Sequence, residues 1–243
     1  MIAPDSRSVG PDSSIRSLAQ AAREGARSLA HVAPERINEI LSSIAHGLRA
    51  AEPVVLEANG RDMERARQKG LDAALCDRLF LDSGRIEAMA RGVEAIRCLA
   101  DPVGDVLAQW DRPNGLTIQR VRVPIGLLGM IFESRPNVAV DAAALCLKSH
   151  NAVLLRGGSE SLDSCLALHA ILRDSLRTCG LPEACVSMVP TAERERVGEM
   201  LAAGDLIDVM IPRGGRGLIE RVTREATMPV FAHLDGICHI YIH

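Results

Sequence analysis

Residues 123–161, VPIGLLGMIFESRPNVAVDAAALCLKSHNAVLLRGGSES, decide the fold of this chain. Their first part, PIGLLGMIF, is an apolar run interrupted by glycines and ended by Glu133, which is typical of a buried parallel strand. The turn SRPN follows. Asn137 is placed to cap a helix over residues 138–149. The stretch therefore opens with a strand, a turn and a helix.

A second strand and a glycine turn complete the unit. Asn151 can end the helix, and AVLLR at residues 152–156 has the length and apolarity of another buried strand. The strand stops at Gly157-Gly158, and Ser159 can cap the next helix. The pattern predicts a βαβ unit with its polar residues at the carboxyl ends of the strands, where open α/β sheets bind ligands.

Composition narrows the class of protein. The 243 residues carry a net charge of −3 with one Trp, one Tyr and three Phe, which argues against a nucleic-acid-binding protein. The seven Cys include no CxxC pair, which favours reduced thiols over a disulfide framework. No apolar run approaches a membrane span and the N-terminus lacks an apolar signal core. We expect a soluble cytoplasmic protein with no membrane partner.

The remaining chain falls into a tail, a helical region, a hairpin and an α/β region. Residues 1–13 have the composition of a disordered tail. Residues 14–100 show helical apolar spacing, with mixed charge typical of solvated helix faces. In residues 101–122, two strand-like runs flank a Pro-Asn-Gly turn, which predicts a hairpin. Residues 123–243 alternate strands and helices and predict a mostly parallel sheet. The strands expected after residue 161 are 186–189, 206–211, 228–234 and 237–242.

Two glycine-rich turns are the clearest candidates for binding. RGGSE at residues 156–160 and PRGGRG at residues 212–217 each follow a predicted strand and open a helix. Glycines let a backbone approach a ligand, and N–H groups at a helix start favour phosphate, to which arginine adds charged contacts. Two ordinary tight turns would have the same spacing.

Cysteine and histidine give weaker signals. Cys238 adjoins His239, but neighbours in a strand point to opposite faces, so Cys238 is interpreted as a small core residue. His169 falls on an apolar helix stripe and is expected to be a packed core histidine. No spacing matches a metal site, so no metal is expected. His233 and Asp235 fit a polar site or a turn equally well. The other six cysteines are also expected to be core residues: Cys76, Cys98, Cys146, Cys165, Cys179 and Cys185.

Several long blocks resemble one family. Besides residues 121–161, these are LADPVG (99–104), GLPEACV (180–186), DVMIPRGGRGL (208–218) and HLDGICHIYI (233–242). They are similar to gamma-glutamyl phosphate reductase, also called glutamate-5-semialdehyde dehydrogenase, of the aldehyde dehydrogenase superfamily. The resemblance implies a Rossmann-type parallel sheet with N-terminal helices and a β-hairpin arm that serves a homo-oligomer. It also implies NADPH-dependent reduction of L-glutamyl 5-phosphate to L-glutamate 5-semialdehyde in proline biosynthesis, through a cysteine thioester.

The resemblance also implies roles for particular residues. Arg156 would bind the 2′-phosphate of NADPH, and the adjacent Gly157 and Gly158 would also belong to the cofactor site. Ser159 or Glu160 would accept from a ribose hydroxyl. Asn137 would stabilise the oxyanion, although its own position also suits a helix cap. Further members of the cofactor groove would be Pro190, Thr191, Gly214 and Gly215.

One departure from the family limits these expectations. In the family the nucleophilic cysteine lies downstream of the GICHIY strand, and this sequence ends at His243. Cys238 does not match that nucleophile. We therefore expect the catalytic domain to be missing, the 243-residue chain to have no reductase activity, and its exposed apolar surface to make it poorly soluble. The alternatives are a shortened NADPH-binding module and an inactive remnant.

Overall fold

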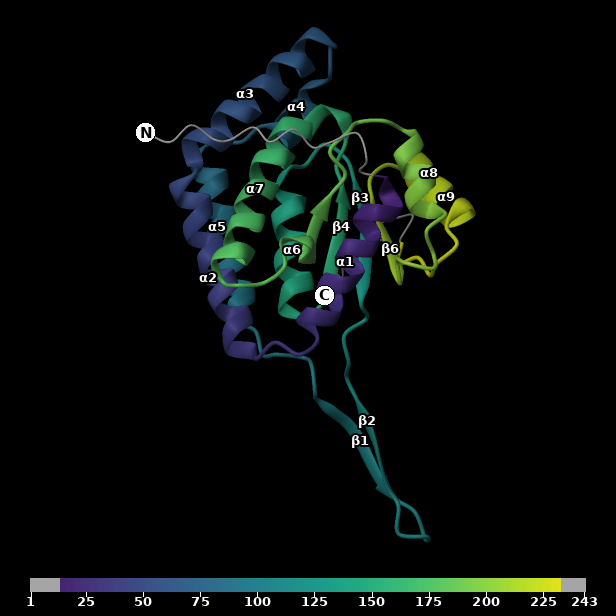
Figure 1. Ribbon diagram of the computed structural model, residues 1–243. Helices are drawn as coiled ribbons and strands as arrows, with labels where there is room; N and C mark the ends of the chain where they lie inside the picture. Colours follow the sequence, from purple (N-terminus) through teal and green to yellow (C-terminus); the bar gives the residue numbers. More distant parts are fainter. Residues whose placement is uncertain (1–13, 233–243) are drawn as a thin grey trace, which may run out of the picture.

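The computed structural model describes residues 14–232 and places a parallel sheet between two layers of helices (Figure 1). The sheet has four strands in the order β5-β4-β3-β6, all parallel. This confirms the predicted α/β class. The strands are β3 (Leu127–Phe132), β4 (Ala152–Arg156), β5 (Val186–Met188) and β6 (Val209–Arg213).

Helices cover both faces of this sheet. On one face, α6 and α7 pack on the strands and are backed by α2, α3 and α5; α1 covers the other face, and α8 packs beside α1 (Figure 1). Leu41, Ile44 and Leu48 are fully buried at helical spacing, which confirms the helical period predicted for this part of residues 14–100. The helices are α1 (Ile15–Leu29), α2 (Pro34–Ala50), α3 (Glu52–Gln68), α4 (Ala73–Leu79), α5 (Ser83–Arg97), α6 (Asn137–Lys148), α7 (Leu162–Thr178), α8 (Glu195–Leu201) and α9 (Arg216–Glu225).

A two-stranded arm projects from the body of the molecule (Figure 1). Its strands β1 (Val106–Asp111) and β2 (Thr117–Val121) pair antiparallel, as the Pro-Asn-Gly signal predicted. Gly115 takes the left-handed conformation that the turn requires, with φ of +85°. Apart from the half-buried Ala108, every residue of the two strands is exposed, including Trp110 and Ile118.

Four local predictions are wrong. Pro136, not Asn137, precedes α6, and Asn137 is its first residue, so it cannot act as the cap. Ser159 begins a short 3-10 helix and makes no capping bond. The strand expected at residues 206–211 begins at Val209, because residues 204–206 form a turn before it. Cys98 is exposed, although a core position was predicted for it. The helix α4 was not predicted from the sequence.

The C-terminal predictions are tested only in part. Of the strand expected over residues 228–234, the structure shows one parallel bridge, between Val230 and Met210. His233, Asp235, Cys238 and His239 lie outside the described residues, as does the tail 1–13. Within the described part, no helix is long and apolar enough to cross a bilayer.

Candidate functional site

The strand order creates a switch point beside β3. The chain runs from β3 to β4 and β5 on one side and returns to place β6 on the other side. Open α/β sheets bind ligands at the carboxyl ends of the strands where the direction reverses. A cavity of about 350 Å³ lies there, and Glu133, Ser134 and Arg135 after β3 face Arg213, Gly214 and Gly215 after β6.

The turn after β6 is built to receive an anion. The Gly215 N–H donates to Glu133 Oε2 at 2.8 Å, directly before α9 begins. A Cβ on Gly214 would lie 2.3 Å from the same carboxylate oxygen, so a side chain at this position would displace Glu133 from its present contact. The start of α9 therefore already binds a carboxylate, and the phosphate of a ligand suits the same N–H groups.

Arg156 is buried at the end of β4 with incomplete hydrogen bonding. Its Nη2 donates to the Ala192 carbonyl at 3.1 Å, while Nε is buried without a partner. Burial lowers the pKa of Arg156, and the charges of Glu160 and Glu133 oppose that shift. Thr191 Oγ1, on the segment after β5, is also buried without a partner. Since unpaired buried polar atoms are uncommon in folded proteins, these two atoms are candidates for contacts with a ligand.

Glu160 is engaged inside the protein. Its Oε1 accepts from the backbone N–H of Ser134 at 2.7 Å and from Ser134 Oγ at 2.8 Å. A Cβ on Gly158 would lie 2.2 Å from that oxygen, so Gly158 gives Glu160 its room. Ser134 is held at a φ of +51°. Glu160 thus ties the turn after β4 to the turn after β3, which leaves less of its carboxylate for the predicted ribose contact.

Asn137 lines a second cavity of about 400 Å³ rather than the first. Its Nδ2 donates to Asp141 Oδ2 at 3.0 Å, one turn along α6. Burial raises the pKa of Asp141, and the hydrogen bond from Asn137 opposes that rise. Arg78 and Arg135 line both cavities, so the two cavities adjoin.

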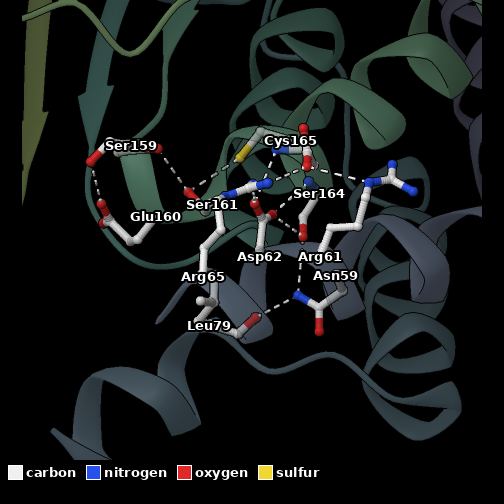
Figure 2. A network of polar contacts seen from close by, with 12 residues as sticks. Asn59, Arg61, Asp62, Arg65, Leu79, Ser159, Glu160, Ser161, Ser164 and Cys165 are labelled. Atoms are coloured by element: carbon white, nitrogen blue, oxygen red, sulfur yellow. Dashed lines mark hydrogen bonds and ion pairs between the residues drawn. The ribbon is translucent and has the colours of Figure 1, made fainter. Parts of the chain in front are cut away.

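A buried polar network fixes the elements around the two cavities. Asp62 of α3 has no exposed side-chain surface and accepts from Ser164 N at 2.7 Å and from Ser164 Oγ at 2.6 Å. Figure 2 shows it between Ser164 and Arg65, with which it forms an ion pair. Since Ser164 lies in the first turn of α7, Asp62 takes the place of a helix cap.

Asn59 extends this network to the connection between α4 and α5. Its Nδ2 donates to the Leu79 carbonyl at 2.8 Å and to Ser164 Oγ at 3.0 Å, and its Oδ1 accepts from Leu81 N at 2.9 Å (Figure 2). The network joins α3, α7 and the end of α4, which carries Arg78. The sequence did not reveal it, because the charges of α3 resemble a solvated face.

Three of the described cysteines are buried in the manner of structural residues. Burial raises the pKa of Cys146, Cys165 and Cys185 to about 12, so these thiols stay protonated. Cys76 and Cys179 are half-buried, and no described cysteine lines either cavity. Among residues 14–232, no group of three His, Cys, Asp or Glu side chains is arranged to hold a metal.

His169 of α7 contacts β5 but is half-buried and lines a further cavity, so it is less enclosed than the predicted packed core histidine. Its Nε2 is 2.9 Å from the Val186 carbonyl, so the neutral ring donates through that nitrogen. Burial lowers the pKa of His169 from 6.5 to about 4.

This shift predicts that stability falls in acid. The unfolded chain binds a proton on His169 below pH 6.5, and the folded chain resists it until about pH 4. The neutral His169 ring is therefore fully compatible with the folded state above pH 6.5. As the pH falls from 6.5 to 4, the free energy of unfolding should decrease by about 3 kcal/mol. Urea titrations across this range should show a smaller decline for His169→Gln than for the parent chain; equal declines would contradict the assignment.

Comparisons with known proteins place this fold in a class. No family model matches the chain. A probable aldehyde dehydrogenase from Listeria monocytogenes superposes with a TM-score of 0.70 at 15% identity, covering 89% of this chain and 44% of that structure. The chain has an aldehyde-dehydrogenase-like fold.

More similar relatives all carry one name. The chain is 54% identical over 226 residues to gamma-glutamyl phosphate reductase of Afipia carboxidovorans, covering 93% of this chain and 53% of that protein. The structure of the Thermotoga maritima reductase superposes with a TM-score of 0.87 at 41% identity, over 89% of this chain and 52% of that structure. The structure of the Saccharomyces cerevisiae reductase superposes with a TM-score of 0.85 at 35% identity, over 93% of this chain and 57% of that structure. The chain is homologous to gamma-glutamyl phosphate reductase and spans about half the length of the curated relatives it matches.

Proposed function

We propose that this chain forms the NADPH-binding part of an enzyme that reduces L-glutamyl 5-phosphate to L-glutamate 5-semialdehyde and phosphate. The names of its relatives support a reductase that acts on gamma-glutamyl phosphate. The place of this reaction in proline biosynthesis is part of the proposal. The observation that carries the cofactor assignment is the pair of buried, unpartnered atoms Arg156 Nε and Thr191 Oγ1 near the carboxyl ends of β4 and β5.

The residues present fit a phosphorylated dinucleotide. Arg156 interacts electrostatically with two further cations, Arg194 and Arg221, which would favour an additional phosphate such as the 2′-phosphate. The N-terminus of α9 at Gly214-Gly215 suits the pyrophosphate. When bound, NADPH supplies the hydride. The other proposed cofactor contacts are Gly157, Gly158, Ser159, Glu160, Pro190 and Thr191.

Asn137 is proposed to support the oxyanion of the thiohemiacetal. One of its two amide N–H groups is held by Asp141, and the second can donate to a reacting oxygen. The thiolate of this chemistry does not come from Cys146, Cys165 or Cys185, because burial keeps those thiols protonated.

The hairpin arm is proposed as a contact between copies of the chain in the cytoplasm. Its apolar side chains are exposed on strands that extend away from the body of the molecule. Exposed apolar surface of this kind is typical of association sites. The residues concerned are Val106, Leu107, Trp110, Leu116 and Ile118.

Substituting Arg156→Ala should weaken NADPH binding by about tenfold to a hundredfold, because it removes a charged donor to phosphate. NADH lacks the 2′-phosphate and should bind almost as well to the variant as to the parent chain. Fluorescence titration with both nucleotides measures this. Arg112→Ala, at the end of the exposed arm, is the control. Equal losses for the two nucleotides would refute the 2′-phosphate role.

A further inference from the structure

The second cavity has a charge pattern of its own. It lies between α4, the start of α5 and the start of α6, and has a volume of about 400 Å³, which is in the range of small-ligand pockets. Its cations Arg78 and Arg135 form no hydrogen bond or ion pair through their side chains within the described part of the chain. The third cation, Arg85, is already satisfied by Asp77 Oδ1 at 2.6 Å and by the Phe80 carbonyl at 2.8 Å.

Two carboxylates line the same cavity, and one of them, Asp77, is paired with Arg85, which leaves Asp141 beside the two free cations. Asp141 Oδ2 accepts from Asn137, while Asp141 Oδ1 accepts from no described group. Burial raises the pKa of Asp141, so a cationic ligand would relieve the cost of holding its charge. The cavity therefore offers two guanidinium groups and one carboxylate oxygen in one place.

We infer that this cavity binds the α-amino-acid end of the substrate: Arg78 and Arg135 take the α-carboxylate and Asp141 takes the α-ammonium group. The assignment rests on the proposed function. It adds to that function the residues that would distinguish an amino acid from a simple aliphatic acyl group.

The position of the cavity suits this role. Arg78 and Arg135 also line the first cavity, at the ends of β3 and β6. A ligand whose amino-acid end lies against Asp141 can extend past Arg135 toward the strand ends, where the cofactor is proposed. Asn137 lies beside Asp141 and would be oriented by the same hydrogen bond near the reacting end.

The charge pattern also favours an amino acid over an inorganic anion. Phosphate would pair with Arg78 and Arg135 but would be repelled by the ionised Asp141. A zwitterionic ammonium-carboxylate group satisfies all three side chains.

Three small ligands separate the contribution of the α-carboxylate to binding from that of the α-ammonium group. L-glutamate carries both α groups, glutarate lacks the ammonium group, and 4-aminobutyrate lacks the α-carboxylate. Calorimetric or ligand-observed NMR titration of the 243-residue chain should show L-glutamate binding at least about tenfold more tightly than either analogue, which corresponds to one charged hydrogen bond.

The arginine variants and the aspartate variant should weaken the binding of different pairs of probes. Arg78→Ala and Arg135→Ala should weaken L-glutamate and glutarate by about tenfold and leave 4-aminobutyrate unchanged. Asp141→Asn should weaken L-glutamate and 4-aminobutyrate but not glutarate, so glutarate also reports that this variant is folded. Arg27→Ala, an exposed substitution on α1 outside both cavities, should change none of them.

Equal affinity for L-glutamate and glutarate, losses that do not follow these patterns, or no binding at millimolar concentration would overturn the inference. The NADPH titration distinguishes its failure from that of the proposed function. A chain that binds NADPH but not L-glutamate keeps the cofactor assignment and loses this subsite. A chain with the opposite behaviour keeps the amino-acid subsite and loses the cofactor.

Discussion

The substitution Asp62→Ala is expected to lower the free energy of unfolding by about 3–5 kcal/mol, because it removes the acceptor from a buried network. Asp62 accepts from the backbone N–H and the hydroxyl of Ser164 and pairs with Arg65. Alanine would leave the N-terminus of α7 without its buried acceptor. For a protein of this size, the melting temperature should fall by about 6–15 °C.

A graded series makes this prediction specific. Asp62→Asn keeps one acceptor oxygen and replaces the other with an NH2 group, so its loss of stability should be smaller than that of Asp62→Ala. Ser164→Ala should cost less after Asp62→Ala than in the parent chain, because the two residues share one interaction. Additive losses for the pair, or a melting temperature unchanged by Asp62→Ala, would contradict the account.

Two glycine-to-alanine substitutions in helices should have opposite effects. A Cβ on Gly25 of α1 would lie 2.9 Å from the backbone nitrogen of Cys185, so α1 would have to move off the residues before β5. We expect Gly25→Ala to destabilise the chain by about 1–3 kcal/mol despite alanine's higher helix propensity. Gly60 of α3 has nothing within 4 Å of its Cβ position. Gly60→Ala should therefore stabilise by about 0.5–1 kcal/mol.

Chemical denaturation of both variants measures the two signs. A loss of stability in both would mean that helix context, and not the backbone contact at Cys185, decides the outcome. Stabilisation in both would mean that α1 moves away from β5 at little cost.

The class of fold could be predicted from the sequence alone. The period of Leu41, Ile44 and Leu48, the apolar runs of β3 and β4 and the glycine turns after the strands are local signals, and each corresponds to an observed element. These signals also place the candidate binding residues at one edge of the sheet. The strand order that creates the switch point is a long-range property and required the structure.

The side-chain contacts could not be predicted, because they join residues far apart in the sequence. Glu160 bonds to Ser134 rather than facing an open groove. Asn137 bonds to Asp141 instead of capping its helix. Asp62, which resembles a surface charge in sequence, proves to be buried against Ser164. In each case tertiary packing decided among local alternatives that the sequence left open.

The central claim is that NADPH binds at the carboxyl ends of the strands. Backbone amide NMR of the isotope-labelled chain, titrated with NADPH, tests it most directly. The account predicts saturable shift changes concentrated at Gly157, Gly158, Thr191, Gly214 and Gly215, and weaker changes with NADH. Saturable changes elsewhere, or none at millimolar NADPH, would contradict the assignment of this edge as the cofactor site.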